Sequence, residues 1–162
     1  MTRPAFLLAP LLTLVLVAAP AGVSAQASDV HVVLGPKLVK DARALGQRDL
    51  DRLTAELERT VERAVAQSGR ANGGRLELTL TDVRPSRPTF EQMARRPGLS
   101  MDSVSNGGAA LEGVEISADG TRRPVRFSWY ESDIRWAGAR ATWSDTHRAF
   151  DLFARQYAQG KR

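Results

Sequence analysis

The sequence contains no cysteine and only two histidines in its 162 residues. The absence of cysteine excludes disulfide bonds and thiolate metal sites, so the chain must be held together by its core alone. His31 and His147 belong to separate expected elements, and the carboxylates do not have the spacing of metal ligands. Calcium-loop and phosphate-loop patterns are also absent. We therefore expect no metal site and no cofactor.

Long hydrophobic runs are also missing, except at the N-terminus. Residues 1–25 have the parts of a secretory signal, with Arg3 before the apolar run Phe6–Ala19 and small residues ending at Ala25. We expect cleavage near Ala25 and a periplasmic or secreted protein. No later run has the length of a membrane span, so we expect no transmembrane segment in the mature chain, residues 26–162.

Hydrophobic periodicity predicts the regular elements. Val30, Val32 and Leu34 alternate along a first strand that ends at Gly35-Pro36. The clearest helix is expected at Arg48–Ser68, where apolar residues recur at spacings of three and four. The other expectations, in chain order, are a connector at Lys37–Gln47, a strand at Arg75–Val83, a hairpin within Gly107–Glu131 and a helix from Thr142 or Ser144 to about Ala158.

This order of elements predicts an α+β fold. Consecutive strands after Arg75 favour an antiparallel meander, and the first strand joins the same sheet through a helical crossover. Two amphipathic helices and one apolar sheet face favour two layers. We expect a single domain over residues 26–162, with a four-stranded mixed sheet, two helices on one face and a long loop at 84–108.

The hairpin sequence predicts its own turn and buried face. Asp119-Gly120 between apolar runs is typical of a two-residue turn. Val125, Phe127 and Trp129 alternate strictly and should face the core.

The first hairpin strand is irregular by the same pattern. A β-bulge at Gly113 would bring Leu111, Val114 and Ile116 to the apolar face and send Glu112 and Glu115 to solvent. The alternative is that Glu112 points inward as a catalytic or binding carboxylate.

The stretch Arg84–Gly108 is the most unusual part of the sequence, with three prolines and four arginines. Thr89 and Gln92 form a capping-box pattern, which predicts a short helix at Phe90–Arg96. A connection of this length in a compact domain is either functional or mobile. The residues that could contact a partner or ligand are Arg84, Arg87, Thr89, Arg95, Arg96 and Asn106.

Two groups of residues could indicate catalysis, and a third could indicate nucleic-acid binding. Ser144, His147 and Asp151 share one face of the expected last helix, but capping and solvation explain them better than a catalytic triad. Asp82 could act as an acid, although an ion pair with Arg84 or an Asx-turn at the strand end explains it equally well.

Aromatic residues near arginines resemble a platform for single-stranded nucleic acid. Trp129 belongs to the core by alternation, and Trp143 precedes the last helix as a hydrophobic staple. We therefore expect no nucleic-acid partner.

Several short stretches resemble a group of uncharacterised exported proteobacterial proteins, some of which are lipoproteins. They fall within residues 30–158 and read TLTDV, RPTFEQ, GGAALEG, ADG and WSDTHRAFDLFA. The resemblance implies a small α/β envelope accessory protein and carries no activity. Unlike the lipoproteins, this chain has no cysteine that could carry a lipid anchor.

The sequence shows no assembled catalytic set, which argues against an enzyme. We expect a non-catalytic envelope accessory or binding protein that acts through Arg84–Gly108. One alternative is a small periplasmic hydrolase using Glu112 or Asp82. Another is a binder of anionic polymer or lipid head groups that uses the arginine-bearing loops. The partner would be an envelope protein or an anionic envelope component.

Overall fold

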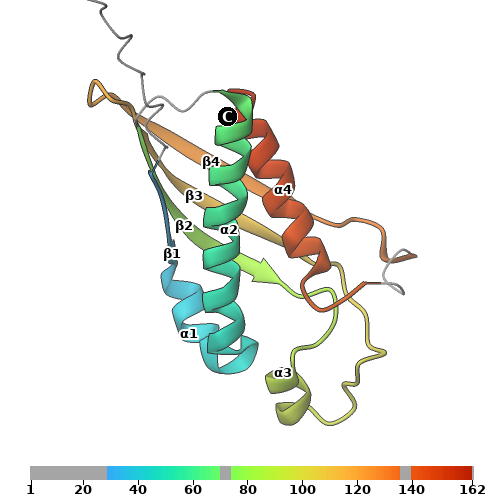
Figure 1. Cartoon of the computed structure of the whole chain (residues 1–162). Helices are drawn as coiled ribbons and strands as arrows, with labels where there is room; N and C mark the ends of the chain where they lie inside the picture. Colours follow the sequence, from blue (N-terminus) through green and yellow to red (C-terminus); the bar gives the residue numbers. More distant parts are fainter. Residues whose placement is uncertain (1–28, 70–73, 136–139, 162) are drawn as a thin grey trace, which may run out of the picture.

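A computed structural model describes residues 29–69, 74–135 and 140–161 of the chain (Figure 1). The expected secretory signal lies outside these residues. The elements in chain order are β1 (Asp29–Leu34), α1 (Pro36–Leu45), α2 (Gln47–Ser68), β2 (Arg75–Arg84), α3 (Phe90–Arg95), β3 (Gly108–Ile116), β4 (Arg122–Tyr130) and α4 (Ser144–Ala158).

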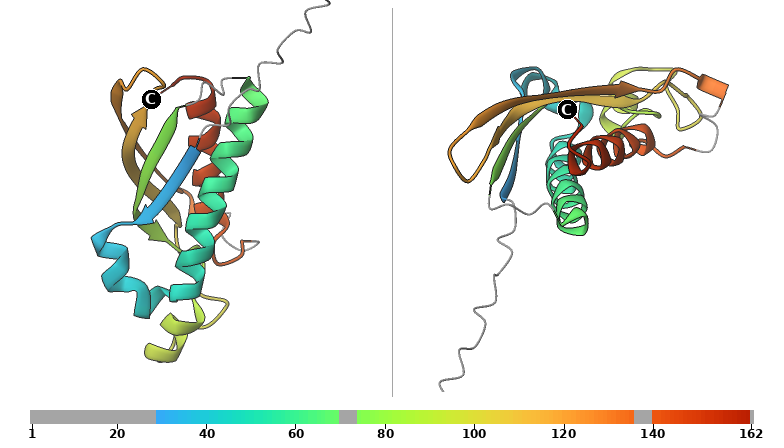
Figure 2. Two further views of the ribbon diagram at one scale, coloured as in Figure 1. Left: turned by 60° about the vertical axis from the view of Figure 1, so that its left-hand side comes forward. Right: turned by 90° about the horizontal axis from the view of Figure 1, so that it is seen from above.

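The four strands form one sheet in the order β1-β2-β3-β4. β1 runs parallel to β2, and the remaining neighbours are antiparallel. A parallel pair needs a crossover connection, which α1 and α2 supply here. Seen from above, α2 and α4 lie together on one face of the sheet (Figure 2). The two-layer α+β prediction is confirmed.

The core lies between this helix pair and the sheet. Its largest side chains come from the apolar stripe of α2, the buried face of α4 and the alternate inward positions of β2. Leu57, Val61, Phe150, Leu76, Leu78 and Leu80 are each at most 2 % exposed. The ring centroids of Phe127 and Phe153 lie 5.5 Å apart, which joins β4 to α4. The inward alternation of Val125, Phe127 and Trp129 is therefore confirmed.

The expected connector at 37–47 is wrong, because Pro36–Leu45 forms α1. Pro36 occupies the first turn, where its missing N–H costs nothing. Leu38, Ala42 and Leu45 form a buried stripe. This stripe is short and contains one small residue, so it gives a weak periodic signal. Gly46, with φ of 98°, then separates α1 from α2.

The turn of the β3–β4 hairpin also differs from the prediction. The N–H of Ser117 donates to the carbonyl of Thr121 over 2.9 Å, which leaves Ala118, Asp119 and Gly120 as a three-residue loop. Only Gly120 needs positive φ, at 82°, as in three-residue loops that end in a left-handed residue.

The longer loop changes the strand register and removes the need for a bulge at Gly113. Leu111 lies opposite Phe127, and Gly113 lies opposite Val125, without interruption. The irregularity of the sheet lies instead in β2, between Leu80 and Asp82. The predicted bulge is wrong because it was built on a two-residue turn.

Five side chains of β3 were assigned to a face on the basis of that bulge, and of these Leu111 is buried as expected. Glu112 is exposed as expected, opposite Arg126. Val114 and Ile116 lie on the open face and not in the core, as their pairing with Pro124 and Arg122 shows. Glu115 is half-buried on the helix-facing side, and not in solvent.

Gly113 has a different role from the one its sequence context indicates. A Cβ atom at this position would lie 2.1 Å from the carbonyl oxygen of Glu77 and 2.9 Å from a methyl group of Leu78. Glycine is therefore required by the close approach of β2, and not by an unusual backbone angle.

None of the described helices combines the length and the apolar character that crossing a bilayer requires.

Candidate functional site

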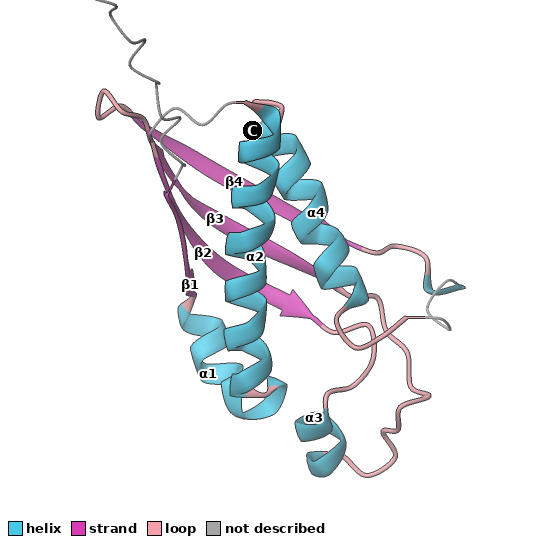
Figure 3. Cartoon of the chain, in the orientation of Figure 1, coloured by secondary structure: helices cyan, strands magenta, loops and turns pink. Residues whose placement is uncertain are grey.

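The residues between β2 and β3, together with the strand ends, form the segment 84–108. Apart from α3 it consists of loops, which lie beyond the end of the helix pair (Figure 3). The predicted capping box is present: Thr89 Oγ1 accepts from Gln92 N, and Gln92 Oε1 accepts from Thr89 N. Thr89 is 2 % exposed and its hydroxyl also donates to the carbonyl of Ala44 in α1. Thr89 therefore has a structural role, and it also lines a groove together with Phe90 and Met101.

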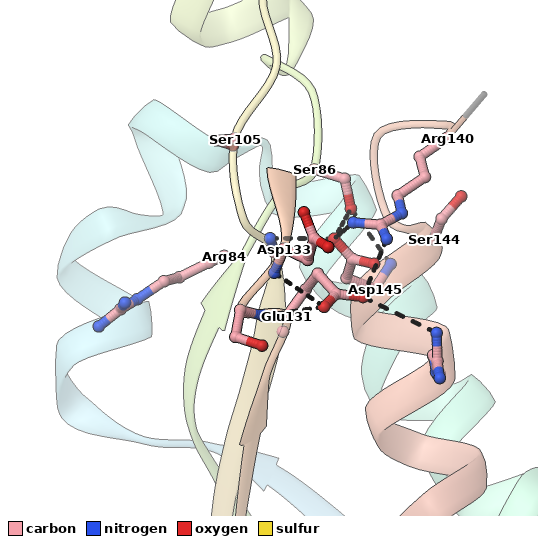
Figure 4. A network of polar contacts seen from close by, with 12 residues as sticks. Arg84, Ser86, Ser105, Glu131, Asp133, Arg140, Ser144 and Asp145 are labelled. Carbon is pink, nitrogen blue, oxygen red and sulfur yellow. Dashed lines mark hydrogen bonds and ion pairs between the residues drawn. The ribbon is translucent and has the colours of Figure 1, made fainter. Parts of the chain in front are cut away.

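A buried polar network fixes both ends of the segment (Figure 4). Asp145, in the first turn of α4, is 2 % exposed. Its Oδ2 accepts from Ser86 Oγ at 2.9 Å, Gly107 N at 3.0 Å and Arg140 Nη1 at 3.1 Å. Ser86 Oγ in turn accepts from Asp145 N at 3.1 Å. The start and the end of the segment are thus tied to one carboxylate at the N-terminus of α4.

Arg140 continues the network to the end of β4. Its Nη2 lies 2.9 Å from Glu131 Oε2, and both side chains are 12 % exposed. Backbone N–H groups of Asp133 and Ser132, followed by the charges of Arg140 and Arg148, hold the pKa of Glu131 below its ordinary value. Removing charges from water is costly unless they are paired, and Arg140 is paired with both Glu131 and Asp145.

Further contacts attach the segment to its surroundings. The hydroxyl of Thr146 contacts the carbonyls of Arg84 and Gly108 at 3.3 and 3.2 Å. The guanidinium of Arg87 donates to the carbonyls of Met101 and Arg140. Arg87, predicted as a ligand contact, therefore braces the segment from within.

A second polar cluster surrounds Asp82 at the other edge of the segment. Lys37 Nζ lies 2.5 Å from Oδ1, and Tyr130 donates its hydroxyl to Oδ2 over 2.7 Å. Arg84 Nε lies 3.3 Å from the same oxygen, and its guanidinium stacks 4.3 Å from the centroid of the Tyr130 ring. The ion pair between Asp82 and Arg84 is as expected.

These contacts shift the titration of the cluster. Burial alone would raise the pKa of Asp82, but the hydrogen bonds from Lys37 and Tyr130 outweigh it and leave the pKa below its ordinary value. Burial and the bond to Asp82 raise the pKa of Tyr130 to about 12. The bond to Asp82 also raises the pKa of Lys37. Asp82 is therefore ionised at neutral pH and does not hold a proton that it could transfer.

The segment encloses a cavity of about 320 Å³, which we name the loop pocket. All of its lining residues lie between Arg84 and Asn106, and they include Pro85, Arg96, Leu99 and Val104. Three of the predicted contact residues, Arg84, Arg96 and Asn106, meet here. Arg87, Thr89 and Arg95 do not line the pocket. A cavity of about 360 Å³ adjoins it over Lys37 and Asp82, and both are lined by Arg84.

Asn106 has a feature that sequence reasoning could not detect. Its side-chain oxygen is buried and has no hydrogen-bond partner in the part of the chain that the structure describes. Most buried polar groups in proteins are paired, so an unpaired acceptor in a cavity wall needs an explanation.

Exposed apolar residues cluster on a second surface of the segment, outside the loop pocket. Phe90 is 78 % exposed and Met101 is 46 % exposed. Both line a groove that Arg48 and Trp143 also border. Sequence analysis missed this surface, although the position of Phe90 directly after the cap Thr89 could have indicated it.

The possible catalytic constellations are not assembled. Ser144 Oγ accepts from Ala141 N at 2.8 Å, and His147 Nε2 lies 3.3 Å from Glu56 Oε2. Asp151 is exposed. Residues 29–69, 74–135 and 140–161 contain no group of three metal-ligating side chains.

Comparisons with models of protein families, with curated proteins and with solved structures gave no match.

Proposed function

We propose that this chain is a non-catalytic binding protein of the bacterial envelope, which takes its partner or ligand on the segment 84–108. One observation carries the proposal: a segment with little regular structure is fixed by buried charges, yet it presents apolar side chains and a cavity to solvent. Binding residues are often found on loops that a rigid scaffold holds in place.

The energetic design of the segment supports this proposal. Burying Asp145 and Arg140 carries a desolvation cost that only complete pairing offsets. Exposing Phe90 leaves a large apolar surface in water, which a contact with a partner would remove. Neither feature is needed to close the sheet or to cover its apolar face, because α2 and α4 already do so.

The hydrolase alternative receives less support. Asp82 accepts a hydrogen bond from Tyr130 and lies close to two cationic groups, so its lowered pKa does not suit a general acid. Glu112 is exposed on the open face of the sheet, opposite Arg126. The remaining alternative, an anionic ligand, is favoured by the presence of Arg84 and Arg96 in the loop pocket.

The envelope location is part of the proposal and is supported by the signal-like pattern of residues 1–25. N-terminal sequencing of the protein purified from its native host tests it. We expect the mature chain to begin at Gln26. A chain that retains Met1 and fractionates with the cytosol would contradict this location.

Binding through the segment can be tested by site-specific photo-crosslinking in cells. A photoreactive phenylalanine analogue at Phe90 or Met101 should give discrete adducts, because both side chains are exposed on the proposed surface. The same analogue at Val33, which is 45 % exposed on β1, is the matched control. Adducts of equal yield from all three positions, or none from Phe90 and Met101, would refute the proposal.

Point substitutions are preferable to replacement of the whole segment. Ser86 is 0 % exposed and belongs to the Asp145 network, so a linker in place of residues 86–105 would disrupt the fold as well as the surface. Phe90→Ser changes only an exposed side chain. It should abolish the adducts formed at Met101, whereas Val33→Thr should leave them unchanged.

A further inference from the structure

The groove beside Phe90 is formed by three parts of the chain that are distant in sequence. It has a volume of about 320 Å³ and lies between the segment, the first turns of α2 and the residues just before α4. We name it the Phe90 groove. Its apolar lining residues are Pro88, Phe90, Met101 and Trp143. Its charged lining residues are Arg48, Asp49, Arg52 and Glu91.

Contacts within the protein hold the apolar side chains of this groove in place. Phe90 directly follows the capping residue of α3, which also bonds to α1. The carbonyl of Met101 accepts from the guanidinium of Arg87. The indole N–H of Trp143 donates to Asp49 Oδ2 over 3.1 Å, which ties the start of α4 to α2. A surface that is ordered before binding loses less entropy when a partner docks.

The composition of the groove is that of the centre of a protein–protein interface, where aromatic residues, methionine and arginine are enriched. Phe90 and Met101 leave large apolar surfaces in water, and Trp143 is half-buried between them and α2. A partner that covers these three side chains gains from apolar burial.

The two carboxylates of the groove are engaged within the fold. Asp49 accepts from Trp143 and is half-buried. The carboxylate of Glu91 lies against Gly46, where an added Cβ atom would be 2.9 Å from Oε2. Neither carboxylate is therefore placed to attract a cationic partner.

The two arginines of the groove are exposed. The guanidinium of Arg52 lies 3.8 Å from Asp49, which is a long contact for an ion pair. Arg48 forms no ion pair or side-chain hydrogen bond within the part of the chain that the structure describes. Guanidinium groups favour carboxylates, so Arg48 is the group that a negatively charged partner would meet first.

The same charges separate a single carboxylate from a polyanion. An anionic polymer or bilayer presents many negative charges side by side, and Asp49 and Glu91 in the lining would repel them. A polypeptide segment with one carboxylate can pair with Arg48 without approaching these residues closely. Its apolar side chain can at the same time cover Phe90.

We infer that the Phe90 groove docks a polypeptide segment of another envelope protein, one that carries an apolar side chain and a nearby carboxylate. The apolar side chain packs against Phe90, Met101 and Trp143, and the carboxylate accepts from Arg48. This inference names the kind of partner for the proposed binding function and rests on it.

The test uses four short peptides, acetylated and amidated, in which zero to three glycines separate a leucine from an aspartate. The readout is the NMR signal of the Trp143 indole N–H in the purified protein. At least one peptide should shift this signal, with millimolar affinity because few atoms make contact. Its asparagine counterpart should bind about threefold more weakly, and its lysine counterpart more weakly still. No shift with any peptide, or equal binding of the three forms, would overturn the inference.

Arg48→Glu tests the charge that the partner must carry. It should weaken binding of the best aspartate peptide by about tenfold and make the lysine counterpart the better ligand. Arg59→Glu is the matched control, because it makes the same change at an exposed position of α2 outside the groove lining. It should leave the order of the peptides unchanged. Equal effects of the two substitutions would reflect the net charge of the protein and would overturn the assignment of Arg48.

Phe90→Ser tests the apolar contact. It should weaken binding of the aspartate peptide by about tenfold, as loss of a central interface side chain does. Val104→Ser is the control, because Val104 is exposed and lines the loop pocket instead. Both variants should melt at the temperature of the wild type, since both change exposed side chains. Equal losses of binding in the two variants, or no loss in Phe90→Ser, would place the peptide elsewhere.

Photo-crosslinking in cells separates the partner class from the proposed function. The photoreactive analogue at Met101 should give adducts with a polypeptide other than this chain. Arg48→Glu should reduce their yield at least about fivefold, whereas Arg59→Glu should not. Adducts with lipid or with a second copy of the chain, or adducts that persist in Arg48→Glu, would preserve the proposed function and refute this partner class. The absence of all adducts would refute both.

Discussion

The helix–sheet core and the segment 84–108 are held together by opposite means. In the core, aliphatic and aromatic side chains from α2, α4 and the sheet exclude water from one continuous layer. In the segment, the buried carboxylate of Asp145 accepts hydrogen bonds from Ser86 and Gly107. These residues lie 59 and 38 positions before it in the sequence. Apolar burial tolerates many similar sequences, whereas a buried network depends on each of its members. The segment should therefore be more sensitive to chemically small changes than the core.

The largest effect is expected from Asp145→Ala. The substitution removes the buried acceptor of three donors. These are Arg140 Nη1, Ser86 Oγ and Gly107 N. Removing one partner of a buried ion pair costs about 3–5 kcal/mol. Urea denaturation gives the free energy of unfolding. A loss below about 1 kcal/mol, the range of exposed pairs, would show that the network is solvated.

A slightly smaller effect is expected from Leu57→Ala, which tests the core in the same way. Leu57 is 0 % exposed on α2, and buried Leu→Ala changes cost about 2–5 kcal/mol. Because the core is one continuous layer, we expect the loss of stability in Leu57→Ala to affect the whole chain. Limited proteolysis should therefore cut Asp145→Ala preferentially within 84–108, but cut Leu57→Ala without that preference. Identical cleavage patterns would remove the distinction between the two regions.

Gly113→Ala tests how closely the strands of the core approach each other. A methyl group would lie 2.1 Å from the carbonyl of Glu77, so the strands must move apart at a cost of about 1–3 kcal/mol. The neighbouring Glu112→Gln is the control, because an exposed substitution changes stability by less than about 0.5 kcal/mol. A silent Gly113→Ala in the same denaturation experiment would contradict the observed register.

The smallest effect concerns Tyr130, at the edge of the segment. Tyr130→Phe removes the hydrogen bond to Asp82 and should cost about 1 kcal/mol at neutral pH. The folded pKa of about 12 lies above the ordinary value near 10, so Tyr130 stabilises the fold fully below pH 10. This contribution is lost as the pH rises from about 10 to about 12. The stability difference between wild type and variant should therefore shrink in that window, and a constant difference would contradict the raised pKa.

The same contrast explains what the sequence could predict. The stripe of α2 and the alternation of Val125, Phe127 and Trp129 repeat at fixed spacings, so the layers and strands of the core were predictable. Within the segment, features that depend on neighbouring residues were also predictable. The capping box of Thr89 and Gln92 and the short helix that it begins are an example.

The errors arose where the outcome depends on contacts between distant residues. The bulge at Gly113 was predicted from the hairpin alone, whereas the close approach of Glu77 in β2 and the length of the turn determine the strand register. Of the predicted contact residues, Arg84, Arg96 and Asn106 line the loop pocket. Arg87 and Thr89 bond to the backbone carbonyls of Arg140 and Ala44, and nothing in the sequence connects these distant residues.

Hydrogen exchange of the segment amides tests the central claim most directly, namely that 84–108 is a fixed element held by Asp145. The amides of Gly107 and Ser86 donate to Asp145 Oδ2 and to the carbonyl of Thr142. We predict that both exchange about as slowly as amides within β2 and β3, and that Asp145→Asn accelerates them while the strand amides stay protected. Exchange of Gly107 and Ser86 in the wild type as fast as in the exposed turn at Asp119 would contradict the account.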